Sequence, residues 1–444
     1  MSPDPTQEPG TSPDPYALVR TRGYAGLLIM AAVLGVPISA GAYGFLALID
    51  ELQRWTYTDL PKALGFHGTP SWWPLPLLAA AGLAVGAAIR YLPGTGGHKP
   101  AEGLSTGGTA KPIELPGIFI AAVATLGLGA VLGPEGPLIL LGSAVAVWAV
   151  GRLKPDMPEQ GRSVVGAAGS FAAVSTLLGS PVTGGFLLME VAGVGGPMLG
   201  VVLVPGLLAA GIGSLVFVGL DSWTGLGTYS LALPNLPAAN APTFGEFGWA
   251  LLIGLAAAFV GAGLRRLALW LQPRVERRRL PATMAMGLAV GGLAITYAEG
   301  SGHSATEVLY SGQSAMDPLI VNSAAYSVGT LTLLCVCKGL AYCLSLSAFR
   351  GGPIFPAMFV GAAGGVALSH LPGLELTPAF AMGIGAMSVS MLKLPLTSVL
   401  LATLLLGTQG ITVMPLVIVA VVVAYVAALR LSPVPARKAA PAPQ

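Results

Sequence analysis

The feature that most constrains this chain is a series of long apolar segments that contain almost no charged residue. Each is long enough to cross a hydrocarbon layer of roughly 30 Å as a helix. They lie near 24–50, 73–93, 116–132, 199–220, 245–272, 282–298, 318–346 and 413–431. Only 9% of the residues are Asp, Glu, Lys or Arg, whereas soluble domains carry roughly 25%. So few charges cannot cover a soluble fold, and the sequence predicts an all-α polytopic membrane protein.

Shorter apolar segments, interrupted by Gly and Pro, lie between the long ones. They fall near 136–151, 164–179, 181–194, 354–370, 376–390 and 395–407. Half-helices at membrane depth are tolerated only where protein packs around them or an aqueous path runs past them, so they are typical of transporters and channels. A membrane-embedded enzyme would need clustered catalytic His, Asp or Ser, and the sequence has no such cluster. We therefore expect no enzymatic activity and no cofactor.

The three cysteines, Cys335, Cys337 and Cys343, stand in one apolar segment without C-x-x-C spacing or a nearby His. We interpret them as buried thiols and expect no metal site. The net charge of +3 is small and the basic residues do not line a helix face, so no nucleic-acid partner is expected.

Lys and Arg cluster near 20–22, 152–154, 265–279 and 430–438. By the positive-inside rule these clusters are cytoplasmic, which puts both termini inside the cell. We expect the chain to be a multi-pass protein of the plasma membrane. The run at 265–279 has an alternative interpretation, in which it binds acidic lipid or a partner protein.

The chain also repeats itself. The stretch 94–107 resembles 299–312, 133–142 resembles 352–361, and 180–185 resembles 394–399, in the same order. The charge clusters put the start of the first half inside and that of the second half outside, so the repeat is predicted to be inverted in topology. The expected domains are a disordered cytoplasmic tail at 1–19, a first membrane repeat at 20–220, an extracellular linker at 221–244, a second membrane repeat at 245–431 and a short cytoplasmic tail at 432–444.

The sharpest local motif is Gly133-Pro134-Glu135-Gly136-Pro137. Pro suits the first turn of a helix, and the free N–H groups of a helix start at membrane depth attract an anion. The Glu135 carboxylate would itself be an anion in that site, which it occupies when ionised and leaves when protonated. The motif therefore predicts a gate and proton acceptor in one side chain. The simpler interpretation is a carboxylate that only caps its own helix.

The motif GGPIFP at 351–356 is the counterpart in the second half. It carries no charge, so it offers only backbone N–H groups, with Ile354 and Phe355 as the expected donors. Two helix starts that converge from the two halves would coordinate a desolvated anion through backbone dipoles. On its own, this motif would be an ordinary loop between packed helices.

Together these motifs resemble the CLC family of chloride channels and chloride/proton antiporters. The segment 133–137 is similar to the family's GxEGP motif, 351–356 to its GGxFxP motif, and 96–100 stands where the family has GSGIP. Over about 20–431, the resemblance implies an inverted-repeat protomer with its own pore, paired as a homodimer in the lipid bilayer. It implies Glu135 as the external gating glutamate. The anion-binding positions that it implies are Gly97, His98, Gly133, Gly136, Gly352, Ile354, Phe355, Gly410 and Thr412.

This sequence lacks three polar side chains of the family pattern. Gly97 stands where the family has a serine hydroxyl, and Gly410, with Thr408 and Thr412 close by, stands where it has a tyrosine near the start of the last helix. Val191 holds the place of the inner glutamate of proton-coupled members, so Glu190, one residue earlier, is the candidate for the proton path. These departures leave chloride selectivity and the inner proton route open.

Several positive side chains stand in unusual places. His98 and Lys99 replace apolar residues of the first motif, where they either compensate for the lost hydroxyl or simply lie in a cytoplasmic vestibule. Lys338, Arg350 and Lys393 lie in apolar stretches. They are either funnel charges that concentrate anions or side chains that reach a membrane interface.

We therefore expect transport of chloride or a similar anion through a CLC-type pore gated by Glu135. Proton-coupled exchange is favoured over a passive gated chloride channel of the voltage-gated type, because the short chain resembles prokaryotic exchangers. The missing inner glutamate favours the channel. A secondary transporter of another solute is the remaining alternative, but it would require more intramembrane carboxylates than Glu135 and Glu190.

Overall fold

The computed structural model describes residues 19–104, 111–193, 197–224 and 231–432. These residues form helices and loops, and they contain no β-strand beyond one isolated bridge between Gly133 and Gly352. Apart from residues 19 and 432, the predicted tails at 1–19 and 432–444 lie outside the described residues, as does part of the predicted linker at 221–244.

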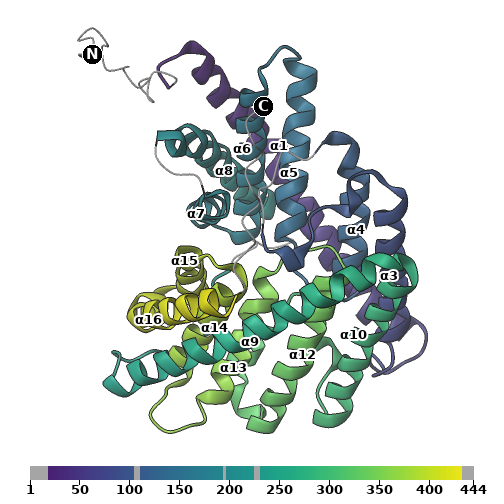
Figure 1. Cartoon of the computed structure of the whole chain (residues 1–444), viewed down its shortest axis with the longest axis vertical. Coiled ribbons are helices and arrows are strands. Elements are labelled where there is room, and N and C mark those ends of the chain that lie inside the picture. The colour runs from purple at the N-terminus through teal and green to yellow at the C-terminus, as the bar shows by residue number, and fades with distance from the viewer. Residues whose placement is uncertain (1–18, 105–110, 194–196, 225–230, 433–444) are drawn as a thin grey trace, which may run out of the picture. The chain divides into compact units, whose positions relative to one another are not determined.

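The described part of the first half forms eight α-helices (Figure 1). In order they are α1 (Arg22–Arg54), the short α2 (Leu60–Ala63), α3 (Pro74–Tyr91), α4 (Leu115–Gly127), α5 (Glu135–Leu153), α6 (Glu159–Leu178), α7 (Pro181–Ala192) and α8 (Pro197–Thr224). The second half has α9 (Phe244–Arg277), α10 (Arg279–Ser301), the short α11 (Met316–Val321), α12 (Val328–Ala348), α13 (Ile354–Leu368), α14 (Leu376–Leu392), α15 (Pro395–Leu405) and α16 (Thr408–Leu431).

The two halves repeat one order of elements. A helix of 33 residues opens the first half as α1, and one of 34 residues opens the second as α9. Single-turn helices then mark the related motifs at Pro100–Glu102 and Ala305–Glu307. The short helices α7 and α15 begin at Pro181 and Pro395, which confirms the helix starts that the sequence predicted there. In this order α16 is the counterpart of α8.

Eight helices among the described residues are long and apolar enough to cross a membrane. Seven of the eight predicted segments overlap one of them, but the prediction for 116–132 is wrong, because α4 ends after 13 residues at Gly127. Conversely, 136–151 belongs to α5, which has 19 residues and is long enough to span. The segment 318–346 is split, because α11 ends at Val321 and α12 begins only after Ser327, whose hydroxyl accepts a hydrogen bond from the Thr330 N–H.

The described chain packs into two compact units that do not follow the sequence halves. Unit 1 comprises the described parts of 1–45, 106–115 and 138–229, in which α6, α7 and α8 pack on one another. Unit 2 comprises the described parts of 46–105, 116–137 and 230–444, so α3 of the first half packs on α10 of the second. The packing units therefore do not test the repeat boundaries at 20–220 and 245–431, which remain a prediction from the sequence.

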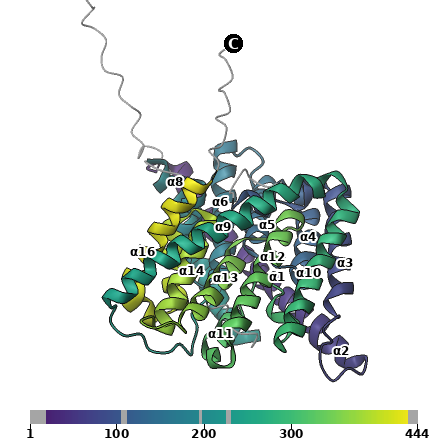
Figure 2. The same cartoon turned by 60° about the horizontal axis from the view of Figure 1, so that its bottom comes forward.

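Unit 2 holds both central motifs. Within it α10, α12 and α13 lie side by side, and α13 packs against α14 (Figures 1 and 2). The α13–α14 contact is close because Gly361 faces the Gly383 carbonyl and Gly383 faces the Gly361 carbonyl, with no side chain between the helices. This close packing holds α13, and with it the segment 351–356, in a fixed position.

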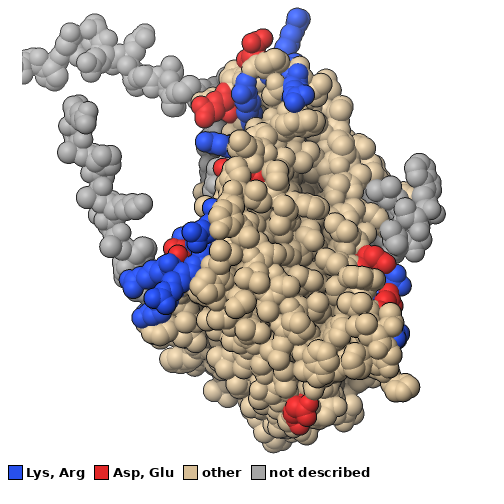
Figure 3. Space-filling model, turned by 90° about the vertical axis from the view of Figure 1, so that its right-hand side faces the viewer, with Lys and Arg blue, Asp and Glu red and all other residues tan. Residues whose placement is uncertain are grey.

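The surface agrees with a membrane setting. In Figure 3 the charged side chains gather at the margins of the view, and a broad area between them carries none. Helix α9, for example, has large apolar side chains on its surface, with Leu252 57% exposed and Phe259 62% exposed. Side chains of this kind are stable on a surface that faces hydrocarbon.

Candidate anion site

The motifs at 133–137 and 351–356 meet backbone to backbone in unit 2. The Gly133 N–H donates to the Gly352 carbonyl over 2.8 Å, and the Gly352 N–H donates to the Gly133 carbonyl over 2.5 Å. Each glycine lies two residues before a helix, since α5 begins at Glu135 and α13 at Ile354. The reciprocal pair therefore holds two helix starts, one from each half of the repeat, next to each other.

The Glu135 carboxylate lies at the start of the opposite helix. Its Oε1 accepts a hydrogen bond of 2.9 Å from the Phe355 N–H in the first turn of α13. The side chain is fully buried, and its Oε2 has no hydrogen-bond partner among the described residues. The carboxylate oxygen thus stands where an anion would bind at a helix start, rather than capping α5 alone.

Glycines leave the space that this carboxylate fills. A Cβ atom at Gly352 or at Gly133 would overlap the Glu135 carboxylate, and one at Gly136 would come within 2.9 Å of the Gly351 carbonyl oxygen. A side chain at any of these positions would push the carboxylate or the two backbones apart. Of the glycines that the sequence singled out, Gly133 and Gly352 therefore border the buried carboxylate, and Gly136 lets the two backbones approach.

A tyrosine that sequence reasoning missed supports the second helix start. The Tyr342 side chain on α12 is fully buried, and its hydroxyl donates to the Pro353 carbonyl over 2.8 Å. One helical turn further along, the Ser345 hydroxyl accepts a hydrogen bond from the Val131 N–H. These contacts fix the segments that precede α13 and α5. In the sequence these two hydroxyl side chains are not distinguished from the other polar residues of α12, so no local signal identifies them.

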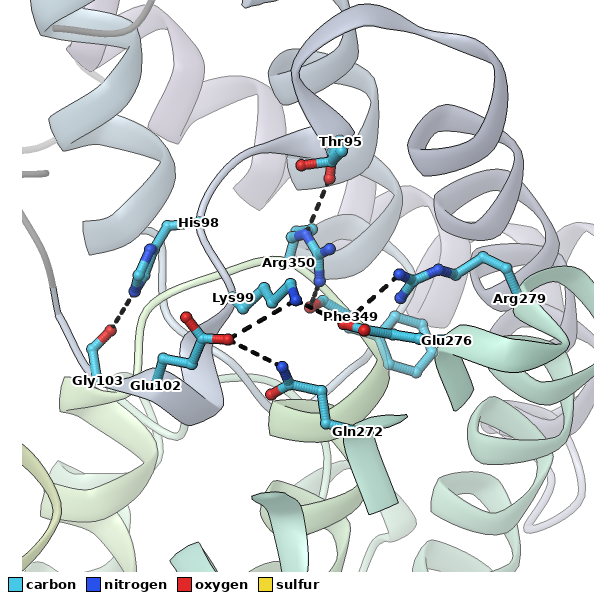
Figure 4. A network of polar contacts seen from close by, with 10 residues as sticks. All are labelled: Thr95, His98, Lys99, Glu102, Gly103, Gln272, Glu276, Arg279, Phe349 and Arg350. Carbon is cyan, nitrogen blue, oxygen red and sulfur yellow. Dashed lines mark hydrogen bonds and ion pairs between the residues drawn. The ribbon is translucent and has the colours of Figure 1, made fainter. Parts of the chain in front are cut away.

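The first motif, at 94–100, belongs to unit 2 but makes different contacts. Gly97 has a φ of +98°, which favours glycine, and its N–H donates to the Gly94 carbonyl. The Nε2 of His98 lies 2.7 Å from the Gly103 carbonyl oxygen (Figure 4). The loop is tied to the second motif by Arg350, whose Nε donates to the Thr95 carbonyl over 3.1 Å. No hydrogen bond among the described residues joins Gly97 or His98 to the Glu135 carboxylate.

Gly410 and Thr412 are not brought to the carboxylate by any hydrogen bond among the described residues. Gly410 lies in the first turn of α16, where its Cα packs against the Thr403 carbonyl of α15. Thr412 is half-buried on the same helix. Glu190 belongs to unit 1, where it lies half-buried near the end of α7.

Two of the cations in the apolar stretches, Lys338 and Arg350, are buried. Lys338 has no exposed surface, and its Nζ donates to the carbonyls of Glu307, Val308 and Leu309 at 2.9, 3.2 and 2.8 Å. Arg350 is 3% exposed. Lys338 therefore holds the loop after α10 in place, and both alternatives for these cations remain predictions.

The described residues contain no group of three or more His, Cys, Asp or Glu side chains that could hold a metal ion. His98 belongs to the loop whose Lys99 pairs with Glu276 beside the start of α10, whereas His303 follows the end of that helix. The 23 residues of α10 span about 34 Å, at 1.5 Å per residue, so the two histidines lie far apart.

Comparison with known proteins agrees with this geometry. Residues 81–429 match the family model described as voltage gated chloride channel. YfeO of Escherichia coli O7:K1, a protein named for ion transport, is 30% identical over 365 residues, which cover 80% of this chain and 82% of YfeO. YfeO of another Escherichia coli strain, SMS-3-5, matches to the same extent.

Solved structures share the fold. The crystal structure of a slow cyanobacterial Cl⁻/H⁺ antiporter aligns with a TM-score of 0.71 and 18% identity, covering 91% of this chain and 94% of that one. A CLC-type fluoride/proton antiporter aligns with a TM-score of 0.67 and 19% identity, covering 90% and 95%. The predicted fold, an all-α membrane protein built as an inverted repeat with broken helices, is therefore confirmed. The chain belongs to the CLC family of anion channels and transporters, whose members are not enzymes.

Proposed function

We propose that this protein moves chloride or a similar monovalent anion across the membrane and that the Glu135 carboxylate is its gate. The observation that carries the proposal is the 2.9 Å hydrogen bond from the Phe355 N–H to the Glu135 Oε1. The ionised carboxylate stands in for an anion at the start of α13 and blocks that place. Once protonated, it no longer competes for the N–H groups and leaves, and an anion takes the position.

We further propose that transport is exchange of the anion for protons. A gate that opens by taking up a proton carries that proton with it, because the carboxylate is the same group in both roles. Two structures with this fold are described as proton antiporters, one for chloride and one for fluoride, which supports exchange over a passive channel. Glu190 is the proposed group of the proton path in unit 1.

The anion itself would be held mainly by backbone N–H groups, since the segment 351–356 offers no polar side chain. The hydroxyl of Thr412 is the proposed replacement for the family's tyrosine, and Thr412→Val tests it. A lowered chloride affinity keeps Thr412 in the site, and an unchanged affinity removes it. The proposed anion contacts are Gly97, His98, Gly133, Gly136, Gly352, Ile354, Phe355, Gly410 and Thr412.

The proposed setting is a homodimer in the plasma membrane with both termini in the cytoplasm. The basic cluster that ends α9 and begins α10 supports this orientation, because cytoplasmic ends of spans are rich in Lys and Arg. A cysteine-accessibility assay with a membrane-impermeant reagent on Ser2→Cys in intact cells tests it. Labelling before the cells are opened would contradict a cytoplasmic N-terminus.

Flux in reconstituted vesicles with an internal pH dye tests the gate and the coupling together. Wild-type protein is expected to move protons uphill against an imposed chloride gradient. Glu135→Gln keeps the size of the side chain but removes its charge, so chloride flux should persist, lose its pH dependence and move no protons. Chloride flux without proton movement in the wild type would rule out exchange. Intact proton movement in Glu135→Gln would remove Glu135 from the gate.

A further inference from the structure

A cavity of about 360 Å³ lies in unit 2 between α9, α12, α13 and α14, which pack on one another (Figures 1 and 2). Its walls include Ala257 of α9, Gly339 of α12 and Met387 of α14. The described residues that line it carry no charged, hydroxyl or amide side chain. The thiol of Cys335 donates to the Val360 carbonyl of α13 over 3.9 Å, so it needs no further partner. The cavity is therefore suited to an apolar ligand.

The cavity lies at membrane depth and opens on an apolar surface. The α12 residues that line it all belong to the middle third of this helix, whose 21 residues span about 31 Å, enough to cross a hydrocarbon layer. Two of the lining side chains also reach the outer surface, since Val260 of α9 is 48% exposed and Val336 of α12 is 52% exposed. The acyl chains of a bilayer therefore have direct access to the opening.

No side chain of the described residues fills this space, because many of the wall residues are glycine or alanine. A Cβ atom at Gly339, for example, would meet only the Leu264 side chain, at 3.7 Å. Protein interiors are usually close-packed, and an apolar cavity of about 150 Å³ is already large enough to bind benzene. Wall atoms that face a void lose dispersion contacts, so a ligand that fills the void is favoured even inside an apolar membrane.

We propose that this cavity binds one acyl chain of a bilayer lipid. The chain enters beside Val260 and Val336, lies across Gly339 and packs against Val360 of α13. The lipid headgroup stays outside, because the lining offers it no polar side chain. A helix of another protein does not fit, since a helix with its side chains is about 10 Å wide. The site does not depend on the proposed gate, because its lining residues do not include Glu135 or Phe355.

Photolabelling of the full-length protein in vesicles tests the site. The probe is a phosphatidylcholine that carries a diazirine in the middle of one acyl chain, and the labelled residues are identified by mass spectrometry. Val360 is 6% exposed, so a chain that stays on the outer surface would contact Phe259 of α9 but not Val360. We expect label on both residues. Label on Phe259 with none on Val360 or Cys335 would overturn the site.

Two glycine substitutions separate the cavity from general lipid contact. Gly339→Leu places a side chain in the cavity and should lower the label on Val360 about fivefold, which corresponds to about 1 kcal/mol. Gly263→Leu on α9 is the matched control, because Gly263 is exposed, does not line the cavity and has nothing within 4 Å of an added Cβ, so the label should not change.

Melting in detergent gives a second measurement on the same pair of variants. Both exchange a helical glycine for leucine and gain helix propensity alike, but only Gly339→Leu fills a void, so it should melt at a higher temperature than Gly263→Leu. Equal labelling of Val360 in the two variants would refute the site. A lower melting temperature for Gly339→Leu would also count against it, because the leucine would then have no space to occupy.

Discussion

Replacing Gly352 with alanine should force the gate open without touching the glutamate itself. The backbone at Gly352 does not have a positive φ, so an alanine there is not strained by its own conformation. Its Cβ, however, would overlap the Glu135 Oε2, while staying 3.0 Å from the Glu135 Cβ. The methyl group therefore competes with the carboxylate for one space and leaves the rest of the site nearly intact.

The size of the effect follows from the hydrogen bond that is lost. A hydrogen bond to a charged group stabilises by about 1.5–3 kcal/mol, which is a factor of roughly ten to a hundred in the occupancy of the blocked state. Chloride efflux from vesicles at neutral pH should therefore rise in Gly352→Ala and approach the rate that the wild type reaches only in acid. Efflux measured between pH 4.5 and pH 7.5 should become nearly flat.

The double variant decides the cause. In a Glu135→Ala background the carboxylate is gone, so Gly352→Ala should change efflux by less than about twofold. Gly364→Ala on the same helix is the matched control, because a Cβ at Gly364 meets nothing within 4 Å and should leave efflux unchanged. If Gly352→Ala raised efflux as much without the carboxylate as with it, the methyl group would be acting elsewhere, and the steric argument would be refuted.

Three further predictions concern selectivity and stability. With Gly97 and Gly410 in place of the family's hydroxyls, liposome flux should show only a shallow preference among chloride, bromide and nitrate, and a steep preference would reveal another ligand. Lys338→Met leaves three carbonyls without a donor, so it should destabilise the protein by roughly 3 kcal/mol or more and lower its melting temperature in detergent. Gly361→Ala should cost about 1–3 kcal/mol because its Cβ would press α13 against the Gly383 carbonyl of α14, and a melting temperature equal to that of Gly364→Ala would contradict it.

Local features of the sequence were sufficient to predict the helix starts of the site. Pro181 and Pro395 begin α7 and α15 because proline fits the first turn, and Glu135 begins α5 within a Gly/Pro motif. Helix ends were less predictable. The apolar run 116–132 continues past the end of α4 at Gly127, since Gly129, with a φ of +105°, turns the chain while the residues around it stay apolar. Hydrophobicity alone does not distinguish a buried helix from a buried extended segment.

Contacts between distant segments could not be predicted in the same way. Arg350 looked like a charge in an apolar stretch, but its partner is the Thr95 carbonyl, 255 positions away. The Lys338 contacts with the loop after α10 are of the same kind, because its acceptors are backbone carbonyls, which every residue has. The meeting of Gly133 and Gly352 was predictable only because the sequence repeat pairs their two motifs.

The repeat also explains why one side chain would suffice as the proposed gate, and this leads to a final prediction. The bridge of Gly133 and Gly352 relates the two motifs residue by residue, so Ile354 holds the place in α13 that Glu135 holds in α5. Only the first half thus supplies a carboxylate, and it lies at the start of the helix from the second half.

Glu135→Ile copies the residue of the second half into the first and should free the start of α13. Unlike Glu135→Gln, it leaves no polar group that can accept the Phe355 N–H, so bound anion would be the only acceptor at this place. Chloride flux should be pH-independent and proton-free, and the chloride affinity of the site should exceed that of Glu135→Gln, measured by titration. A lower affinity in Glu135→Ile than in Glu135→Gln would mean that the side chain at 135 helps to hold the anion, rather than competing with it.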